Sequence, residues 1–174
     1  MILTHTVGKR DDTACDAFLT RLNNATTGRT QVTSDGLACY THGVPMHMGS
    51  RVDFAQLIKT YKSTQEVTRY SPAAISSIEK VPRFGNPDES KISTSYIERF
   101  NLSVRMQVRR FTRLTNAHSK SLDHHAAMVA LFVAFYNFCR KHESCGDGKQ
   151  TPAMAAGLTD HVWKLAELLK AAVS

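Results

Sequence analysis

Residues 95–105 read Ser95-Tyr-Ile-Glu-Arg-Phe-Asn-Leu-Ser-Val-Arg105, and the predicted fold depends on this stretch. No Gly or Pro interrupts residues 95–114. Apolar side chains recur there at Ile97, Leu102, Met106 and Val108. Such spacing is typical of an amphipathic helix. We therefore expect one long helix over 95–114, with the acid Glu98 near its start.

The next segment is the most apolar part of the chain. Residues 121–142 predict a second helix, and its middle, Ala126–Tyr136, is apolar on every side. We expect this helix to be buried at the centre of the fold. Its apolar run is shorter than the roughly 20 residues that cross a bilayer, so the sequence predicts no membrane span.

The N-terminal half combines strands and helices. β-branched residues predict strands at 2–7 and 30–33, and apolar residues every fourth position predict a helix from Asp11 or Asp12 to Asn24 between them. That order suggests a βαβ unit. Residues 37–42 suggest a further helix. A strand at 75–81 is expected to turn at Pro82 and form a hairpin that ends near Ile92.

Composition places the chain among folded proteins with an anionic partner. We expect one domain over 1–174 of the α/β class, because 42% of the residues are hydrophobic and 21% are charged. The net charge of +7 favours nucleic acid or an anionic membrane surface. With only four cysteines and no apolar leader at the start, we expect reduced thiols and a cytoplasmic location.

The positive charge is concentrated just after Glu98. Residues 99–122 contain six cations and no acid: Arg99, Arg105, Arg109, Arg110, Arg113 and Lys120. Arg105, Arg109 and Arg113 recur every four residues, so we expect them on one helix face, where guanidinium groups suit phosphates. The alternative is an ordinary solvated helix face. Without acids to pair with, contact with DNA is favoured.

Two acids are candidates for chemistry, and each has a simpler explanation. Asp35 follows a predicted strand in an Asp-Gly turn dipeptide, which needs no chemical role. Glu98 fits a capping box with Ser95, in which it would only accept a backbone hydrogen bond. Local sequence alone favours the cap.

Taken in order, these motifs resemble a known family. Thr-Ser-Asp35-Gly36 and Ser95 to Arg105 are similar to the segments that carry the last two acids of DDE transposases. The resemblance to transposases of the insertion-sequence-one type continues through three further motifs: Arg109 to Ala117, Tyr136 to His142, and Thr151 to Trp163. It covers the chain from Val7 to about Leu169.

The resemblance implies an RNase H-like catalytic core with long C-terminal helices that cleaves and transfers DNA strands in transposition. Three carboxylates of such a core hold two Mg²⁺ or Mn²⁺ ions, which activate the attacking oxygen and stabilise the leaving one. Asp35 would be the second acid and Glu98 the third. Arg105 would contact a DNA phosphate, within a DNA-binding set of Arg99, Arg105, Arg109, Arg110 and Arg113.

The chain departs from the family pattern at its N-terminus. The strand that carries the first acid has no counterpart, so we expect a core that lacks its first strands and an incomplete metal site. Asp11, Asp12 and Asp16 are poor replacements, because they begin a helix. We therefore expect no cleavage or joining of DNA by the isolated chain. The alternative function is a non-catalytic remnant that binds DNA, self-associates or modulates a full-length transposase.

Two Cys/His groups are candidates for zinc. They are Cys139-x-x-His142-x-x-Cys145, and the looser set Cys39, His42 and His47. Neither spacing is a familiar finger pattern and neither has an obvious fourth ligand. Loop histidines and free thiols are the favoured interpretation.

Overall fold

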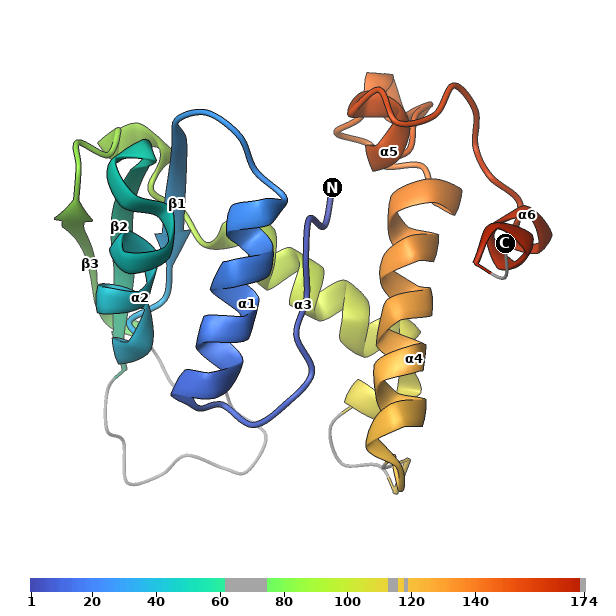
Figure 1. Cartoon of the computed structure of the whole chain (residues 1–174), viewed down its shortest axis with the longest axis horizontal. Helices are drawn as coiled ribbons and strands as arrows, with labels where there is room; N and C mark the ends of the chain where they lie inside the picture. Colours follow the sequence, from blue (N-terminus) through green and yellow to red (C-terminus); the bar gives the residue numbers. More distant parts are fainter. Residues whose placement is uncertain (62–74, 113–115, 118, 173–174) are drawn as a thin grey trace. The chain divides into compact units, whose positions relative to one another are not determined.

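Figure 1 shows the computed structural model of the chain, which describes residues 1–61, 75–112, 116–117 and 119–172. Within these ranges the protein has a mixed three-stranded sheet and six α-helices, so the predicted α/β class is confirmed. The chain divides into two compact units, which are Gly8–Ser103 and Met1–Val7 together with Val104–Ser174. The expectation of one domain over 1–174 stays a prediction.

The sheet of the first unit is built around a buried central strand. β1 (Thr30–Ser34) pairs in parallel with β2 (Val52–Tyr61), and α2 (Ala38–Met48) connects them. This is a βαβ unit, one element later than the sequence predicted. β3 (Ile75–Phe84) pairs antiparallel with β2, so the strand order is β1-β2-β3. The predicted hairpin ending near Ile92 is wrong, because β3 pairs back onto β2 and residues 89–91 form a 3₁₀ turn.

β3 tolerates a proline because it is an edge strand. Pro82 lies opposite Ala55 beside a register irregularity, and most of β3 is exposed. A proline lacks the N–H that a central strand would need. The strand therefore continues past Pro82 to Phe84, two residues beyond the predicted turn. The Pro72 connection lies outside the described residues.

Helices α1 and α2 supply the main core of this unit. α1 (Asp12–Asn24) begins where the Asp11 side chain accepts the N–H of Ala14 at 3.0 Å, as an N-cap does. Figure 1 shows α2 against the sheet and α1 beside it. The buried core consists of Cys15, Leu19, Val44, Met48, Val52 and Phe54. Burial of this apolar surface holds the βαβ unit together.

The predicted strand at residues 2–7 is wrong. Both backbone polar groups of Ile2 bond to the side-chain amide of Asn137, the N–H to Oδ1 and the carbonyl to Nδ2, each at 2.9 Å. A buried amide thus takes the place that a neighbouring strand would have. The segment has no regular secondary structure and is not part of the sheet.

α3 (Ser95–Gln107) is shorter than the predicted helix over 95–114. Val108 leaves helical geometry, with φ −109° and ψ 100°, and its side chain becomes buried. Residues Arg109–Phe111 then form a separate 3₁₀ turn. The helix therefore ends before Arg109, at the point where Val108 leaves helical geometry and is buried.

The second unit contains the apolar helix, which is not the buried centre that the sequence predicted. α4 (Leu122–Ala134) continues into a π-helical turn (Phe135–Cys139), and this turn contacts α5 (Pro152–Ala155) and α6 (Leu165–Ala171). Only Phe132 of α4 is buried. The other large apolar side chains are at least one-third exposed at Leu122, Met128, Leu131 and Phe135. Packing is concentrated at the C-terminal end of this helix. The main apolar cluster belongs to the first unit.

None of the helices within the described ranges is long and apolar enough to cross a membrane.

Candidate nucleic-acid interface

The described cations of the arginine-rich segment have no carboxylate partner among the described residues. Arg99 and Arg105 are exposed on α3, Arg109 and Arg110 are exposed in the following 3₁₀ turn, and Lys120 is exposed before α4. Across the described part of the chain, no Asp or Glu forms an ion pair with any of them. Cations elsewhere do have such partners, as Arg29 has in Asp53 at 2.7 Å. Unpaired cations of this kind are available to an external anion.

The cations do not share one helix face. Because α3 ends at Gln107, Arg109 follows the helix instead of continuing its face. The prediction that Arg105, Arg109 and Arg113 line one face is therefore wrong for Arg109. Arg113 lies outside the described residues. The break places Arg105 at the end of a helix and the Arg109–Arg110 pair on a turn.

Asp35 lies directly after β1, as the sequence predicted. Its Oδ1 accepts the N–H of Leu37 at 3.2 Å, and its Oδ2 accepts a bond from the Arg10 guanidinium at 3.3 Å. Both side chains of this ion pair are exposed, so solvent screens the pair and it contributes little to stability. The Asp35 carboxylate thus stabilises the turn at the Asp-Gly dipeptide, and it also forms an ion pair with Arg10 at the surface.

A buried amide fixes the backbone of this turn. Gln56 on β2 donates from Nε2 to the carbonyls of Asp35 and Leu37, at 3.0 and 3.1 Å. Its Oε1 accepts from Arg83 Nε at 2.9 Å and from Thr41 Oγ1 at 3.4 Å. Every polar group of the Gln56 side chain is therefore used, which is what a buried amide requires.

Glu98 is held by a lysine and a threonine. Lys59 on β2 donates to its Oε1, and the hydroxyl of Thr94 donates to the same oxygen at 2.7 Å. The pKa of Glu98 is lowered below its usual value. The hydrogen bond from Lys59 is the largest cause, and the hydrogen bond from Thr94 is the second. The predicted capping box is wrong, because the N–H of Ser95 bonds to Ser93 Oγ instead. Glu98 is an ionised, cation-bound carboxylate.

Among the described residues, Asp35 and Glu98 do not make up a two-metal centre by themselves. Asp35 and Glu98 are connected to neighbouring stretches of β2, through Gln56 and Lys59 respectively. Their oxygens already accept bonds from Arg10, Leu37, Lys59 and Thr94. Within the described ranges, no three His, Cys, Asp or Glu side chains gather to hold an ion.

The Cys/His sets do not assemble as zinc sites in the described residues either. His47 bonds to Asp16 at 3.2 Å. His142 lies against the backbone carbonyl of Tyr136 at 3.3 Å, and burial lowers the pKa of its imidazole. All four cysteines are free thiols.

Sequence reasoning missed several residues that shape the two acidic positions. Lys59 and Arg10 belong to no motif, and only the folded chain brings them to Glu98 and Asp35. Gln56 did leave a signal, since it is a polar residue in the middle of the apolar strand Val52–Ile58. A polar side chain at such a position needs internal partners.

A comparison of the chain with protein-family models, with curated proteins and with solved structures finds no match. The resemblance to insertion-sequence transposases therefore stays a prediction from the motifs.

Proposed function

We infer that the chain is a DNA-binding protein of the transposase type, which contacts the phosphate backbone through its arginine-rich segment and does not cleave DNA by itself. One observation carries this proposal. The cations from Arg99 to Lys120 lie in an acid-free segment, and those that are described have no carboxylate partner within the described ranges. Arginine forks suit phosphate oxygens in shape and charge.

An RNase H-like core is part of the proposal. It is supported by a parallel β1-α2-β2 unit with Asp35 at the end of its first strand, and by Glu98 near the start of a later helix. The expected partner is duplex DNA without sequence preference, because charge and not base-edge readout supplies the contact.

Association with a second copy of the chain is the other interaction that we propose. In the described residues β1 pairs with β2 alone, and we propose that its other edge pairs with a strand of a second chain. Unpaired strand edges are templates for association between chains. A full-length transposase is the partner that the resemblance suggests.

Binding to a labelled duplex of random sequence over a range of KCl concentrations tests the proposal. We expect weak binding, and we expect Arg105→Ala with Arg109→Ala to lower both the affinity and its salt dependence. Each lost phosphate contact removes about 0.9 from the slope of log K against log salt. Arg29→Ala is the matched control, since Arg29 is paired with Asp53 outside the segment. An unchanged affinity and salt slope in the double variant would contradict the proposal.

A further inference from the structure

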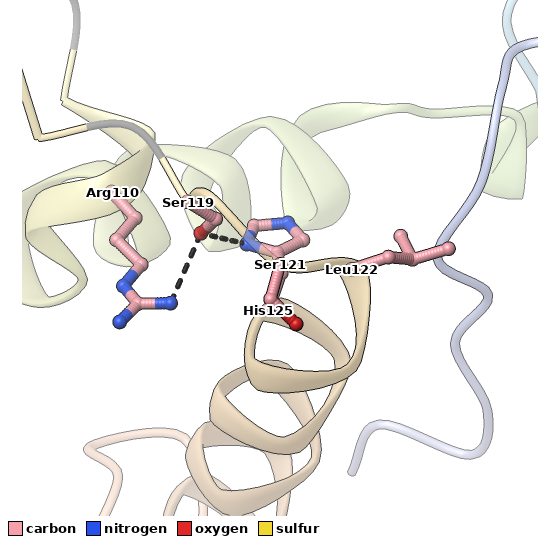
Figure 2. Close-up of a pocket in the computed structure, with 5 residues that line it drawn as sticks. All are labelled: Arg110, Ser119, Ser121, Leu122 and His125. Atoms are coloured by element: carbon pink, nitrogen blue, oxygen red, sulfur yellow. Dashed lines mark hydrogen bonds between the residues drawn. The ribbon is translucent and has the colours of Figure 1, made fainter.

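The second unit contains a hollow of about 390 Å³ that the proposed function does not yet use. Its lining comes from three places: the 3₁₀ turn after α3, the segment before α4, and the first turns of α4. The lining residues are Arg110, Ser119, Ser121, Leu122 and His125 (Figure 2). No acid lines it.

A chain of hydrogen bonds orders the polar side of this hollow. Arg110 Nη1 donates to Ser119 Oγ at 3.0 Å, and Ser119 Oγ lies 2.9 Å from His125 Nδ1. Figure 2 shows the guanidinium and the imidazole on two sides of that hydroxyl oxygen. A guanidinium only donates, so the Ser119 oxygen accepts from Arg110. When the imidazole is neutral and its Nδ1 carries no proton, the Ser119 hydroxyl donates its hydrogen bond to that nitrogen.

This arrangement leaves donors for an external group. A guanidinium carries five N–H donors, and Arg110 uses one of them in the chain just described. No carboxylate pairs with Arg110 among the described residues. The ring of Phe111 packs against the imidazole of His125, with centroids 5.1 Å apart, and helps to fix its position. The side chains are therefore held in place before any ligand arrives.

The N-terminal end of α4 adds positive charge character to the same hollow. Ser121 caps the helix by accepting the N–H of His124 at 3.4 Å. The first backbone N–H groups of a helix have no partner within it, and they carry the positive end of its dipole. Asp123 in this first turn partly offsets that charge, but it does not line the hollow. An anion is the ligand that these groups favour together.

We propose that Arg110, Ser119 and His125 form a binding pocket for a single phosphate of the DNA backbone. The proposal rests on the DNA-binding function above, and it assigns one defined phosphate position within an interface that is otherwise only a set of exposed cations. Arg110 supplies the charge, Ser119 sets the direction of the guanidinium, and His125 anchors Ser119.

Three variants separate this pocket from general charge. Arg110→Gln removes a charge from the pocket, Ser119→Ala removes the hydroxyl and keeps every charge, and Lys149→Gln removes an exposed charge elsewhere in the same unit. Duplex affinity is measured for each over a range of KCl concentrations, after thermal melting shows that the variant is folded. A titration of wild-type protein with inorganic phosphate, followed through the NMR signal of the His125 ring, is independent of any variant.

The pocket predicts a distinct result for each variant. Arg110→Gln lowers the salt slope by about 0.9, which is about eightfold in affinity near 0.1 M salt. Ser119→Ala lowers affinity at an unchanged slope, and Lys149→Gln changes neither. Phosphate shifts the His125 signal of the wild type.

The outcomes also keep the two proposals apart. If the wild type binds no DNA, the proposed function fails. If the wild type binds DNA but Arg110→Gln or Ser119→Ala behaves like Lys149→Gln, the pocket is overturned while the DNA-binding function stands. If a pocket variant does not fold, an unmoved His125 signal in the phosphate titration overturns the pocket.

Discussion

The ammonium of Lys59 donates to the carboxylate of Glu98, so a residue of β2 supplies the positive charge beside the acid that the family pattern would assign to a metal. The Lys59 side chain is 21% exposed and that of Glu98 is 52% exposed. Thr94, which is buried, supplies a second donor. Lys59 therefore balances the negative charge of Glu98, and Lys59 and Thr94 together donate hydrogen bonds to its Oε1.

Loss of Lys59 is expected to raise the pKa of Glu98. The pKa of Glu98 is lowered in the folded protein, so its contribution to stability is present above the pKa of an unfolded glutamate, about 4.3, and is lost as the pH falls through the folded value. Lys59→Met should cost at most about 1 kcal/mol at neutral pH, because the pair is partly solvated. Denaturant unfolding of both proteins at neutral and acidic pH measures the difference.

The difference between the two proteins should vanish under acidic conditions, where Glu98 is protonated in both. Lys149→Met is the control, since Lys149 has no carboxylate partner among the described residues. A stability loss that is the same at every pH would mean that Lys59 acts by packing and not through Glu98.

Incubation of the isolated chain with DNA and Mg²⁺ or Mn²⁺ should produce neither nicking nor strand transfer. Two-metal chemistry needs several converging carboxylates. Asp35 and Glu98 are bound by Arg10 and Lys59, without a third acid nearby in the described residues. Supercoiled plasmid and labelled DNA ends provide the assay. A metal-dependent product that disappears in Glu98→Gln would refute this expectation.

Gly43 allows α1 and α2 to approach, so Gly43→Ala should destabilise the protein. A Cβ at this position would lie 2.6 Å from Cδ1 of Leu19, which is fully buried. Overpacking of this kind costs about 1–3 kcal/mol, which exceeds the gain of about 1 kcal/mol from replacing a helical glycine by alanine. Urea unfolding measures the change.

Two comparisons test the stated cause of that change. Gly8→Ala is the control, because its Cβ would meet its nearest neighbour, Ala14 Cβ, at an ordinary 3.7 Å. In a Leu19→Ala background the cost of Gly43→Ala should shrink, since the clashing methyl group is gone. An equal cost in both backgrounds would show that the contact with Leu19 is not responsible.

His161 should make the attachment of α6 sensitive to pH. Its Nδ1 lies 2.6 Å from Asp160 and its Nε2 lies 2.9 Å from Glu167. Hydrogen bonds to Asp160 and then to Glu167 raise the pKa of His161, and His161 lowers the pKa of both acids. The histidine's contribution is complete below the unfolded value of about 6.5 and is lost as the pH rises through the folded value.

The two acids set the lower limit of that window. Their contribution is present above the unfolded values of about 4 and is lost as the pH falls. The protection of α6 amides, taken relative to their intrinsic exchange rate at each pH, should therefore be greatest between about pH 4.5 and 6.5, and His161→Gln should remove this maximum. His124→Gln, on the exposed start of α4, should not. The same protection of α6 at every pH in the wild type would contradict the prediction.

Local patterns predicted the elements whose stability is local. The spacing of apolar residues located α1, and the turn signals after residue 33 located the end of β1 and Asp35. The helix starts expected at Ser95 and near Ser121 also agree with α3 and with α4, which Ser121 caps. These features depend on neighbours within one or two helical turns.

Features that depend on distant partners were not predictable. The strand expected at 2–7 required a neighbouring strand, and Ile2 bonds instead to Asn137, 135 positions away. Hydrophobicity predicted burial of α4, yet burial depends on what packs against it. The sequence pointed to the acids Asp35 and Glu98 but not to their ion-pair partners Arg10 and Lys59, because an ion pair between distant residues leaves no pattern in the sequence.

Gln56 gives the Asp35 turn a property that its ion pair lacks. The four hydrogen bonds of this amide involve no ionisable acid or imidazole. High salt can weaken the exposed contact between Asp35 and Arg10, but it does not remove the bonds that hold the backbone of Asp35 and Leu37. The carboxylate can therefore exchange partners while its position on the sheet stays constant.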